Sequence, residues 1–203
     1  MKEEFWHSHV TDKSFKVLQE LRKHYTFVLI GGWAVFFYTK ALKSKDIDII
    51  VEPAVLGRLK MEFDVRKNER LKKYEIELDG FDVDIYLAHW SHIGLPAEIV
   101  FKNAVSREGF LVPSKEILLI LKLCAYAQRK GSLKGKKDKI DIISLLYYDS
   151  IAFEQFKAFV REYDGDDLLA ELRSIFAHTK AVEELNLNQK HFSDFKKKIL
   201  SQL

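Results

Sequence analysis

One stretch constrains the fold more than any other: residues 29–51, LIGGWAVFFYTKALKSKDIDIIV. A short β-rich run ends at two glycines, about ten residues of helical character follow, and a second apolar run begins at Asp46. Asp46 and Asp48 stand at positions i and i+2 of that second run. In a strand both carboxylates point to one face, about 6–7 Å apart along the chain. The stretch therefore predicts strand, turn, helix and strand, with two neighbouring carboxylates.

The two carboxylates indicate a cation site. Like charges at this spacing raise each other's pKa unless cations neutralise them, and ligands that are all oxygen suit Mg²⁺ or Mn²⁺. The alternative is a polar strand face in water, which the surrounding apolar residues make less favourable. We therefore predict that Asp46 and Asp48 bind a divalent metal.

Gly31 and Gly32 supply the other half of the predicted site. Glycines directly after a strand let the backbone turn sharply and let a phosphate approach the amide groups that begin the next helix. Glycine pairs also mark many ordinary turns, and the sequence contains neither GxGxxG nor the phosphate-binding loop GxxxxGK[ST]. The order of glycine turn, helix, basic segment 43–45 and Asp-Ile-Asp is what favours a phosphate site.

This order resembles the nucleotidyltransferase superfamily with the polymerase-β-like fold, whose signature is a Gly-Gly or Gly-Ser turn followed by a DxD strand. The Gly-Gly-Trp-Ala form here is most similar to small transferases of the abortive-infection toxin type and the antibiotic-modifying type. The resemblance implies an α/β (α+β) fold with a mixed sheet flanked by helices, and two Mg²⁺ or Mn²⁺ ions held by Asp46, Asp48 and a third acid. It also implies that Gly31 and Gly32 bind the nucleotide.

The loop before the DxD strand departs from the family pattern. Family members often carry Arg and Thr where this chain has Lys43 and Ser44, and a basic residue where it has Leu42. By the resemblance, Ser44 and Lys45 would still contact the nucleotide.

The family places its third carboxylate on a neighbouring strand, and residues 74–88, YEIELDGFDVDIYLA, offer two candidates. Alternating polar and apolar residues on both sides of an Asp-Gly pair predict a hairpin with a type I′ turn. Asp82 and Asp84 then share one face. Asp84 precedes a hydrophobic pair, as the third carboxylate of the family does, so we assign it that role. The alternative for both residues is the solvated outer face of a sheet.

A second resemblance lies further along the chain. Residues 115–129 are predicted to form a long amphipathic helix, residues 130–139 (KGSLKGKKDK) a mobile positive loop, and residues 139–148 another helix. Transferases of the abortive-infection type carry a Lys-Leu-x-Ala helix with a downstream Arg, and then a helix with the pattern basic-Asp-x-x-Asp.

The residues of this chain that match those motifs are Lys122, Arg129, Lys137, Asp138 and Asp141. By that match the three basic residues would contact the triphosphate, while the two acids would orient them or the acceptor. The alternative is an ordinary set of ion pairs on helix surfaces.

A chain of 203 residues is long enough for a compact catalytic domain with an extension. We predict a catalytic domain over residues 1–150 and three amphipathic helices over residues 151–203, which resemble no family. No run of 18 apolar residues occurs, which argues against a membrane partner. The polar N-terminus and the single cysteine favour a cytoplasmic protein.

The predicted reaction moves a nucleoside monophosphate from an NTP such as ATP to an acceptor hydroxyl. A net charge of +3 is too balanced to indicate nucleic-acid binding by itself. The lysines of residues 130–139 favour an RNA acceptor, such as a tRNA 3′ end, over a small molecule or a protein side chain. A second copy of the chain or an antitoxin is the macromolecular partner that the resemblance implies. The rival functions are a DxD glycosyltransferase and a non-catalytic nucleotide-binding module, against which the glycine turn and the third carboxylate argue.

Overall fold

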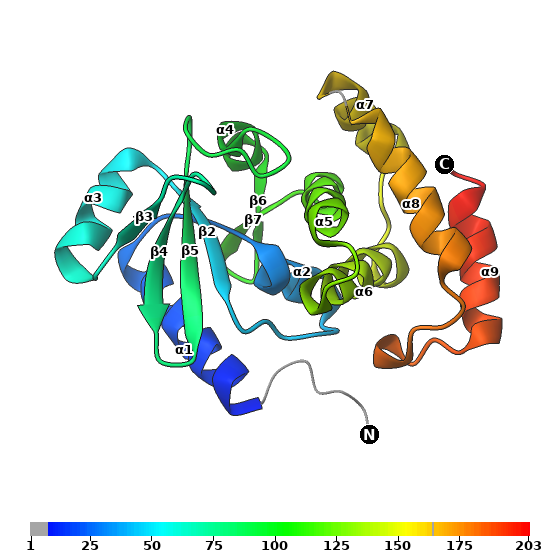
Figure 1. The fold of residues 1–203 in the computed structure, drawn as a ribbon, viewed down its shortest axis with the longest axis horizontal. Coiled ribbons are helices and arrows are strands. Elements are labelled where there is room, and N and C mark those ends of the chain that lie inside the picture. Colours follow the sequence, from blue (N-terminus) through cyan, green and yellow to red (C-terminus); the bar gives the residue numbers. More distant parts are fainter. Residues whose placement is uncertain (1–7, 164) are drawn as a thin grey trace. The chain divides into compact units, whose positions relative to one another are not determined.

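The computed structural model describes residues 8–163 and 165–203. The chain divides into two compact units, of which residues 8–114 form one and Lys115–Leu203 the other (Figure 1). The predicted catalytic domain, residues 1–150, begins outside the described residues and extends beyond this division. Its assignment as the functional unit stays a prediction.

A seven-stranded mixed sheet forms the first unit, in the order β3-β4-β5-β2-β1-β7-β6. Its strands are β1 (Val28–Ile30), β2 (Ile47–Val51), β3 (Arg66–Asn68), β4 (Lys73–Leu78), β5 (Phe81–Leu87), β6 (Ala104–Arg107) and β7 (Phe110–Pro113). The DxD strand β2 lies between β1, to which it is antiparallel, and β5, to which it is parallel. The predicted α/β class with a mixed sheet is confirmed.

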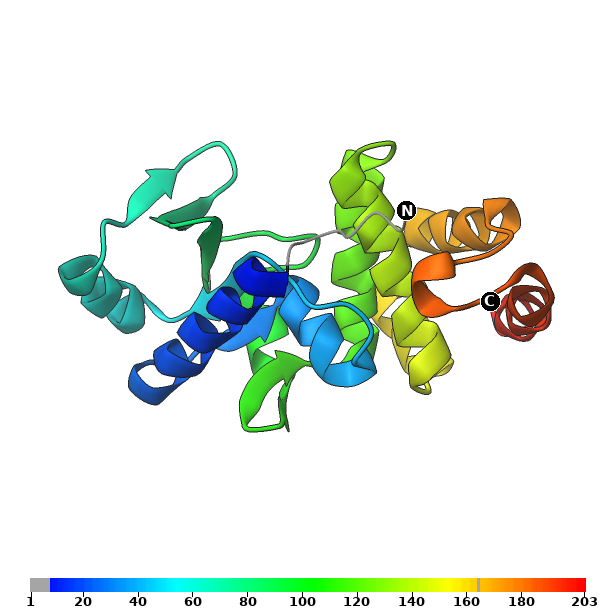
Figure 2. The same cartoon turned by 90° about the horizontal axis from the view of Figure 1, so that it is seen from below.

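The helices of this unit are α1 (Ser8–His24), α2 (Gly31–Thr39), α3 (Pro53–Glu62) and α4 (Ala97–Lys102). The predicted helix after the glycine pair is α2, and Figure 2 shows it beside α1. Trp33 joins the two helices: its ring centroid lies 5.2 Å from that of Phe15, and its Nε1 donates to Ser14 Oγ at 3.0 Å. Since Trp33 is fully buried, it is a core residue.

The two hairpins of the sheet have different turns. A type I′ turn needs a positive φ at both central residues. The Asp79-Gly80 turn between β4 and β5 has a positive φ only at Gly80, so the prediction of type I′ is wrong there. Lys13 on α1 donates to both the carboxylate and the carbonyl oxygen of Asp79, a tertiary contact that the local pattern does not contain. Between β6 and β7, in contrast, φ is 49° at Glu108 and 80° at Gly109.

The second unit is helical. Its elements are α5 (Lys115–Arg129), α6 (Leu133–Tyr148), α7 (Phe153–Glu162), α8 (Asp166–His178), the 3₁₀ turn η1 (Glu183–Leu185) and α9 (Gln189–Leu200). Helices α5 and α6 pack side by side through long apolar runs that are almost completely buried (Figure 2). Helices α7, α8 and α9 confirm the three helices predicted over residues 151–203. None of the helices in the described part of the chain is long and apolar enough to cross a membrane.

Residues 130–139 do not form the predicted mobile loop. Helix α6 begins at Leu133, because Ser132 caps it by accepting a hydrogen bond from the Gly135 amide at 3.0 Å. Lys130 pairs with Glu171 at 2.7 Å and Lys136 with Glu184 at 3.5 Å. The prediction was wrong because a capping serine and tertiary ion pairs outweigh the local excess of lysine and glycine.

Candidate active site

The glycine turn places Asp48 against the start of α2. Gly31 has a φ of +68°, and a Cβ added to it would overlap the Asp48 carboxylate. Glycine is therefore required here both for its backbone conformation and for the space that it leaves. Gly32 is the buried second residue of the same helix. The turn was predicted to admit a phosphate, and in the structure it admits the side chain of Asp48.

Register places two of the predicted carboxylates side by side. Asp48 of β2 is the direct partner of Asp84 of β5, so the two side chains share a face of the sheet. Asp82 is exposed and lies opposite Glu77 instead. Asp46 lies directly before β2, where its Oδ1 accepts a hydrogen bond from the Asp82 amide at 3.4 Å. The arrangement favours Asp84 over Asp82 as the third acid.

The electrostatics of Asp84 are unusual for an aspartate. Burial, followed by the negative charge of Asp48, raises the pKa of Asp84 to about 6, although Lys73 favours the ionised form. Its side chain is only 19% exposed. A carboxyl group whose pKa is raised by burial and by a like charge is typical of functional sites.

Lys73 and Glu75 of β4 belong to the same cluster, and the sequence analysis missed both. Glu75 is the direct partner of Asp84 across β4 and β5. The Lys73 Nζ lies 2.6 Å from Asp84 Oδ2 and 2.8 Å from Glu75 Oε1. The available signal was the alternation KYEIEL, which puts residues 73 and 75 on one face, but only the pairing of the strands shows that this face is shared with Asp84.

The chemical type of these donors suits a hard divalent cation. Asp48 and Asp84 offer carboxylate oxygens from adjacent strands, and Asp46 lies two residues before Asp48. In the described residues, no three or more His, Cys, Asp or Glu side chains are gathered as a group that could hold a metal. Asp84 instead binds the ammonium of Lys73.

The segment before β2 carries the other predicted nucleotide contacts of this unit. Ser44 is buried and Lys45 is half-buried, directly before Asp46. Lys43 turns to α1, where its Nζ lies 2.7 Å from Asp12 Oδ1 and lowers the pKa of that carboxyl. The nucleotide contacts assigned to Ser44 and Lys45 stay predictions.

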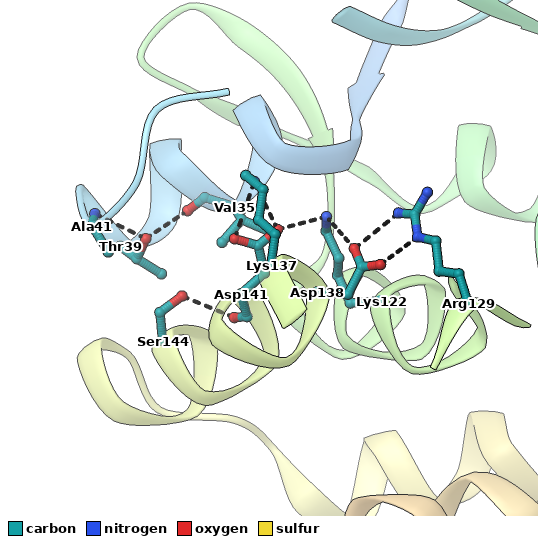
Figure 3. A network of polar contacts seen from close by, with 9 residues as sticks. All are labelled: Val35, Thr39, Ala41, Lys122, Arg129, Lys137, Asp138, Asp141 and Ser144. Carbon is teal, nitrogen blue, oxygen red and sulfur yellow. Dashed lines mark hydrogen bonds and ion pairs between the residues drawn. The ribbon is translucent and has the colours of Figure 1, made fainter. Parts of the chain in front are cut away.

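The second unit brings the matched motif residues together (Figure 3). The Lys122 Nζ of α5 lies 2.7 Å from Asp141 Oδ2 and 3.2 Å from Asp138 Oδ1, both on α6. Arg129 binds Asp138 through Nε and Nη2, and Lys137 lies 3.2 Å from Asp141 Oδ2. The sequence motifs therefore form one network rather than scattered pairs.

This network is largely buried, and three cations in it face two carboxylates. The side chains of Asp138 and Asp141 are 2% and 1% exposed, and that of Lys122 is 7% exposed. Burial opposes the ionisation of Asp138, but the charges of Lys122 and Arg129 together outweigh it, so the pKa of Asp138 is lowered. Surface ion pairs, the alternative considered for these residues, do not describe them. Arg129, at 41%, is the most exposed of the three cations.

Comparison with solved structures identifies the fold as nucleotidyltransferase-like. JHP933 from Helicobacter pylori is 15% identical, with a TM-score of 0.53 over 97% of this chain and 92% of that one. A "putative nucleotidyltransferase" from H. pylori gives the same identity and TM-score over 97% of this chain and 96% of that one. An antigenic nucleotidyltransferase-like protein from Paracoccidioides brasiliensis is 17% identical, with a TM-score of 0.42 over 82% and 93% of the two chains.

In sequence, no protein-family model matches the chain, and neither does any curated protein. The likeness is therefore one of fold, and it extends over nearly the whole chain.

Proposed function

We propose that the protein transfers a nucleoside monophosphate from an NTP to an acceptor hydroxyl. The observation that carries the proposal is the pair Asp48 and Asp84, placed side by side by strand register, with Gly31 leaving room for the Asp48 carboxylate at the start of α2. Two half-buried carboxylates side by side on neighbouring strands repel each other, and a bound cation would relieve that repulsion.

The transfer exchanges one bond at the α-phosphorus for another. The acceptor oxygen bonds to that phosphorus, the bond to the oxygen bridging to the β-phosphate breaks, and pyrophosphate leaves. In this proposal Asp84, which lies beside Asp48 on the neighbouring strand, takes the proton of the attacking hydroxyl. Asp46, Asp48 and Asp84 would hold Mg²⁺ or Mn²⁺, which when bound neutralises charge on the triphosphate and on the leaving group.

The remaining residues have binding roles in this proposal. The first amides of α2, at Gly31 and Gly32, carry the positive end of the helix dipole and suit a phosphate. In the second unit, Arg129 is the most exposed of the three cations and therefore the one most accessible to a phosphate group. Lys122, through Asp138, holds the Arg129 guanidinium in a fixed orientation.

The acceptor is open to direct experiment. The argument for RNA rested on a positive loop, but those residues are helical, and Lys130 and Lys136 pair with Glu171 and Glu184. The proposal therefore covers the transfer itself, with RNA, a small molecule such as an antibiotic, and a protein side chain as separate acceptor classes.

The test is to incubate the protein with each α-³²P-labelled NTP, Mg²⁺, and separated RNA, small-molecule and protein fractions of a lysate. Label should enter one fraction, and Asp48→Asn should abolish it. Asp79→Asn is the matched control, since Asp79 is an exposed turn residue of the same sheet. Labelling that Asp48→Asn leaves intact, or no labelling of any fraction, would refute the proposed function.

A further inference from the structure

Lys73 is an ammonium placed at the edge of the carboxylate pair. It is the first residue of β4, and its side chain is only 11% exposed. Its Nζ makes two short contacts, 2.6 Å to Asp84 Oδ2 and 2.8 Å to Glu75 Oε1. A buried cation needs such compensation, because removing it from water costs several kcal/mol.

Three carboxylates form a row across adjacent strands. Glu75 of β4 is in register with Asp84 of β5, which is in register with Asp48 of β2. Asp84 therefore has an ammonium on its β4 side and a like charge on its β2 side. Glu75 has a second partner besides Lys73: its Oε1 accepts a hydrogen bond from Asn68 Nδ2 at 3.1 Å.

We propose that Lys73 is a displaceable counter-ion of the cation site. It binds Asp84 when no divalent metal is present, and it is retained by Glu75 when a metal takes Asp84. This inference rests on the proposed function, which makes Asp84 a metal ligand.

The physical reason is that two positive charges compete for one carboxylate. A divalent cation on Asp84 repels the Lys73 ammonium, and it takes the oxygen lone pairs that the ammonium uses. Glu75 prevents this exchange from leaving an unpaired buried ammonium, which would be strongly unfavourable. Lys73 and Glu75 are thus positioning residues, which set how readily Asp84 becomes available.

The test measures Mn²⁺ affinity of the full-length protein by the electron paramagnetic resonance signal of free Mn²⁺. Lys73→Met should bind Mn²⁺ about tenfold more tightly, because the competing ammonium is gone. Glu75→Gln should bind it more weakly, because Lys73 then depends on Asp84 alone. Lys73→Arg keeps the charge and should resemble the parent.

The double variant Lys73→Met/Glu75→Gln separates displacement from a general field effect. It removes one positive and one negative charge, so a field effect alone predicts the affinity of the parent. Displacement predicts tighter binding than in the parent. Lys13→Met is the matched control: Lys13 pairs with Asp79 at the same 2.6 Å, but both side chains are exposed, and its Mn²⁺ affinity should not change.

Each outcome supports or overturns the inference. Tighter binding by Lys73→Met and by the double variant supports it. If Lys73→Met does not fold, as judged by circular dichroism, the double variant and Glu75→Gln decide. If Mn²⁺ binding depends on Asp48 but the Lys73 and Glu75 variants bind Mn²⁺ as tightly as the parent, this inference is overturned and the proposed function stands. A parent protein with no Asp48-dependent Mn²⁺ binding overturns both.

Discussion

The pKa of a carboxyl group shielded from solvent is raised in one compact unit and lowered in the other. In the sheet unit, Asp84 lies beside another carboxylate, and its pKa rises to about 6. In the helical unit, Asp138 lies between Lys122 and Arg129, and its pKa falls although it is more deeply buried. Burial favours the protonated form of both groups and is the largest cause of the raised pKa of Asp84, whereas at Asp138 the two neighbouring positive charges outweigh it.

The difference also separates two kinds of evidence for function. Opposite charges in the helical network satisfy one another, so stability alone accounts for them. Like charges side by side in the sheet unit repel each other, and such pairs are more common at functional sites. The carboxylate row is thus the stronger evidence for an active site, while triphosphate binding by the helical network rests on the motif resemblance.

The largest expected effect is the loss of transfer on removing one carboxylate that we assign to the metal. Asp48→Asn, or Asp46→Asn, should reduce the rate of transfer at least about 10³-fold, equivalent to roughly 4 kcal/mol of barrier. The free energy of unfolding without metal should stay the same or rise, because repulsion between like charges is relieved. Single-turnover labelling and thermal unfolding in EDTA measure the two effects. Transfer at the parental rate would show that the metal-site assignment is wrong.

In the helical network, by contrast, removing a carboxylate should lower the free energy of unfolding. Asp138→Asn leaves Lys122 and Arg129 with one carboxylate fewer, and should lower the free energy of unfolding by about 3–5 kcal/mol. Urea denaturation at neutral pH checks this. Asp79→Asn, which removes an exposed partner of Lys13, is the control and should unfold like the parent. If Asp138→Asn unfolded like the parent, the helical and sheet units would no longer differ in how their carboxylates affect stability.

The third prediction concerns pH. The pKa of Asp84 is about 6 in the folded protein against an ordinary value of 3.8, so the folded state binds this proton more tightly than the unfolded state. The contribution of Asp84 to stability is therefore fully present below about pH 4 and is lost as pH rises through 6. The loss is up to about 3 kcal/mol.

The measurement compares the parent with Asp84→Asn by urea denaturation between pH 4 and pH 8. Relative to the variant, the parent should lose stability across this window. In Asp48→Asn the loss should be smaller, because one cause of the raised pKa is removed. Parallel curves for the parent and Asp84→Asn would mean that Asp84 titrates as an ordinary carboxyl.

The smallest effect should come from Asp82, which is exposed and outside the row. Asp84→Asn should be inactive, whereas Asp82→Asn should retain part of the transfer activity. Steady-state labelling rates of the two variants, at equal protein and NTP concentrations, test this. The reverse result would move the third acid by two residues.

Local pattern predicted the parts of the fold that local interactions determine. The long helix over residues 115–129 was predicted with the bounds that α5 has, and the DxD strand, the glycine turn and the hairpin of β4 and β5 were also predicted. The loop over residues 130–139 and the type I′ turn were wrong, because a serine cap and tertiary ion pairs act there.

Local pattern was also insufficient to predict every residue of the candidate site. Periodicity was enough to put Asp82 and Asp84 on one face, and the family resemblance favoured Asp84, but the contact of Asp84 with Asp48 follows from the register of β2 and β5. Lys73 and Glu75 were missed because they join the site through pairing of β4 with β5. Strand register depends on the whole sheet, and no short motif contains it.

The central claim is that Asp48 and Asp84 together form a cation site. Anomalous diffraction at the manganese edge, from crystals grown with Mn²⁺ and a non-hydrolysable NTP analogue, tests it most directly. We predict a peak about 2.0–2.2 Å from carboxylate oxygens of both Asp48 and Asp84, with Lys73 withdrawn to Glu75. A peak that lies elsewhere, with the Lys73 contact to Asp84 intact, would contradict the account.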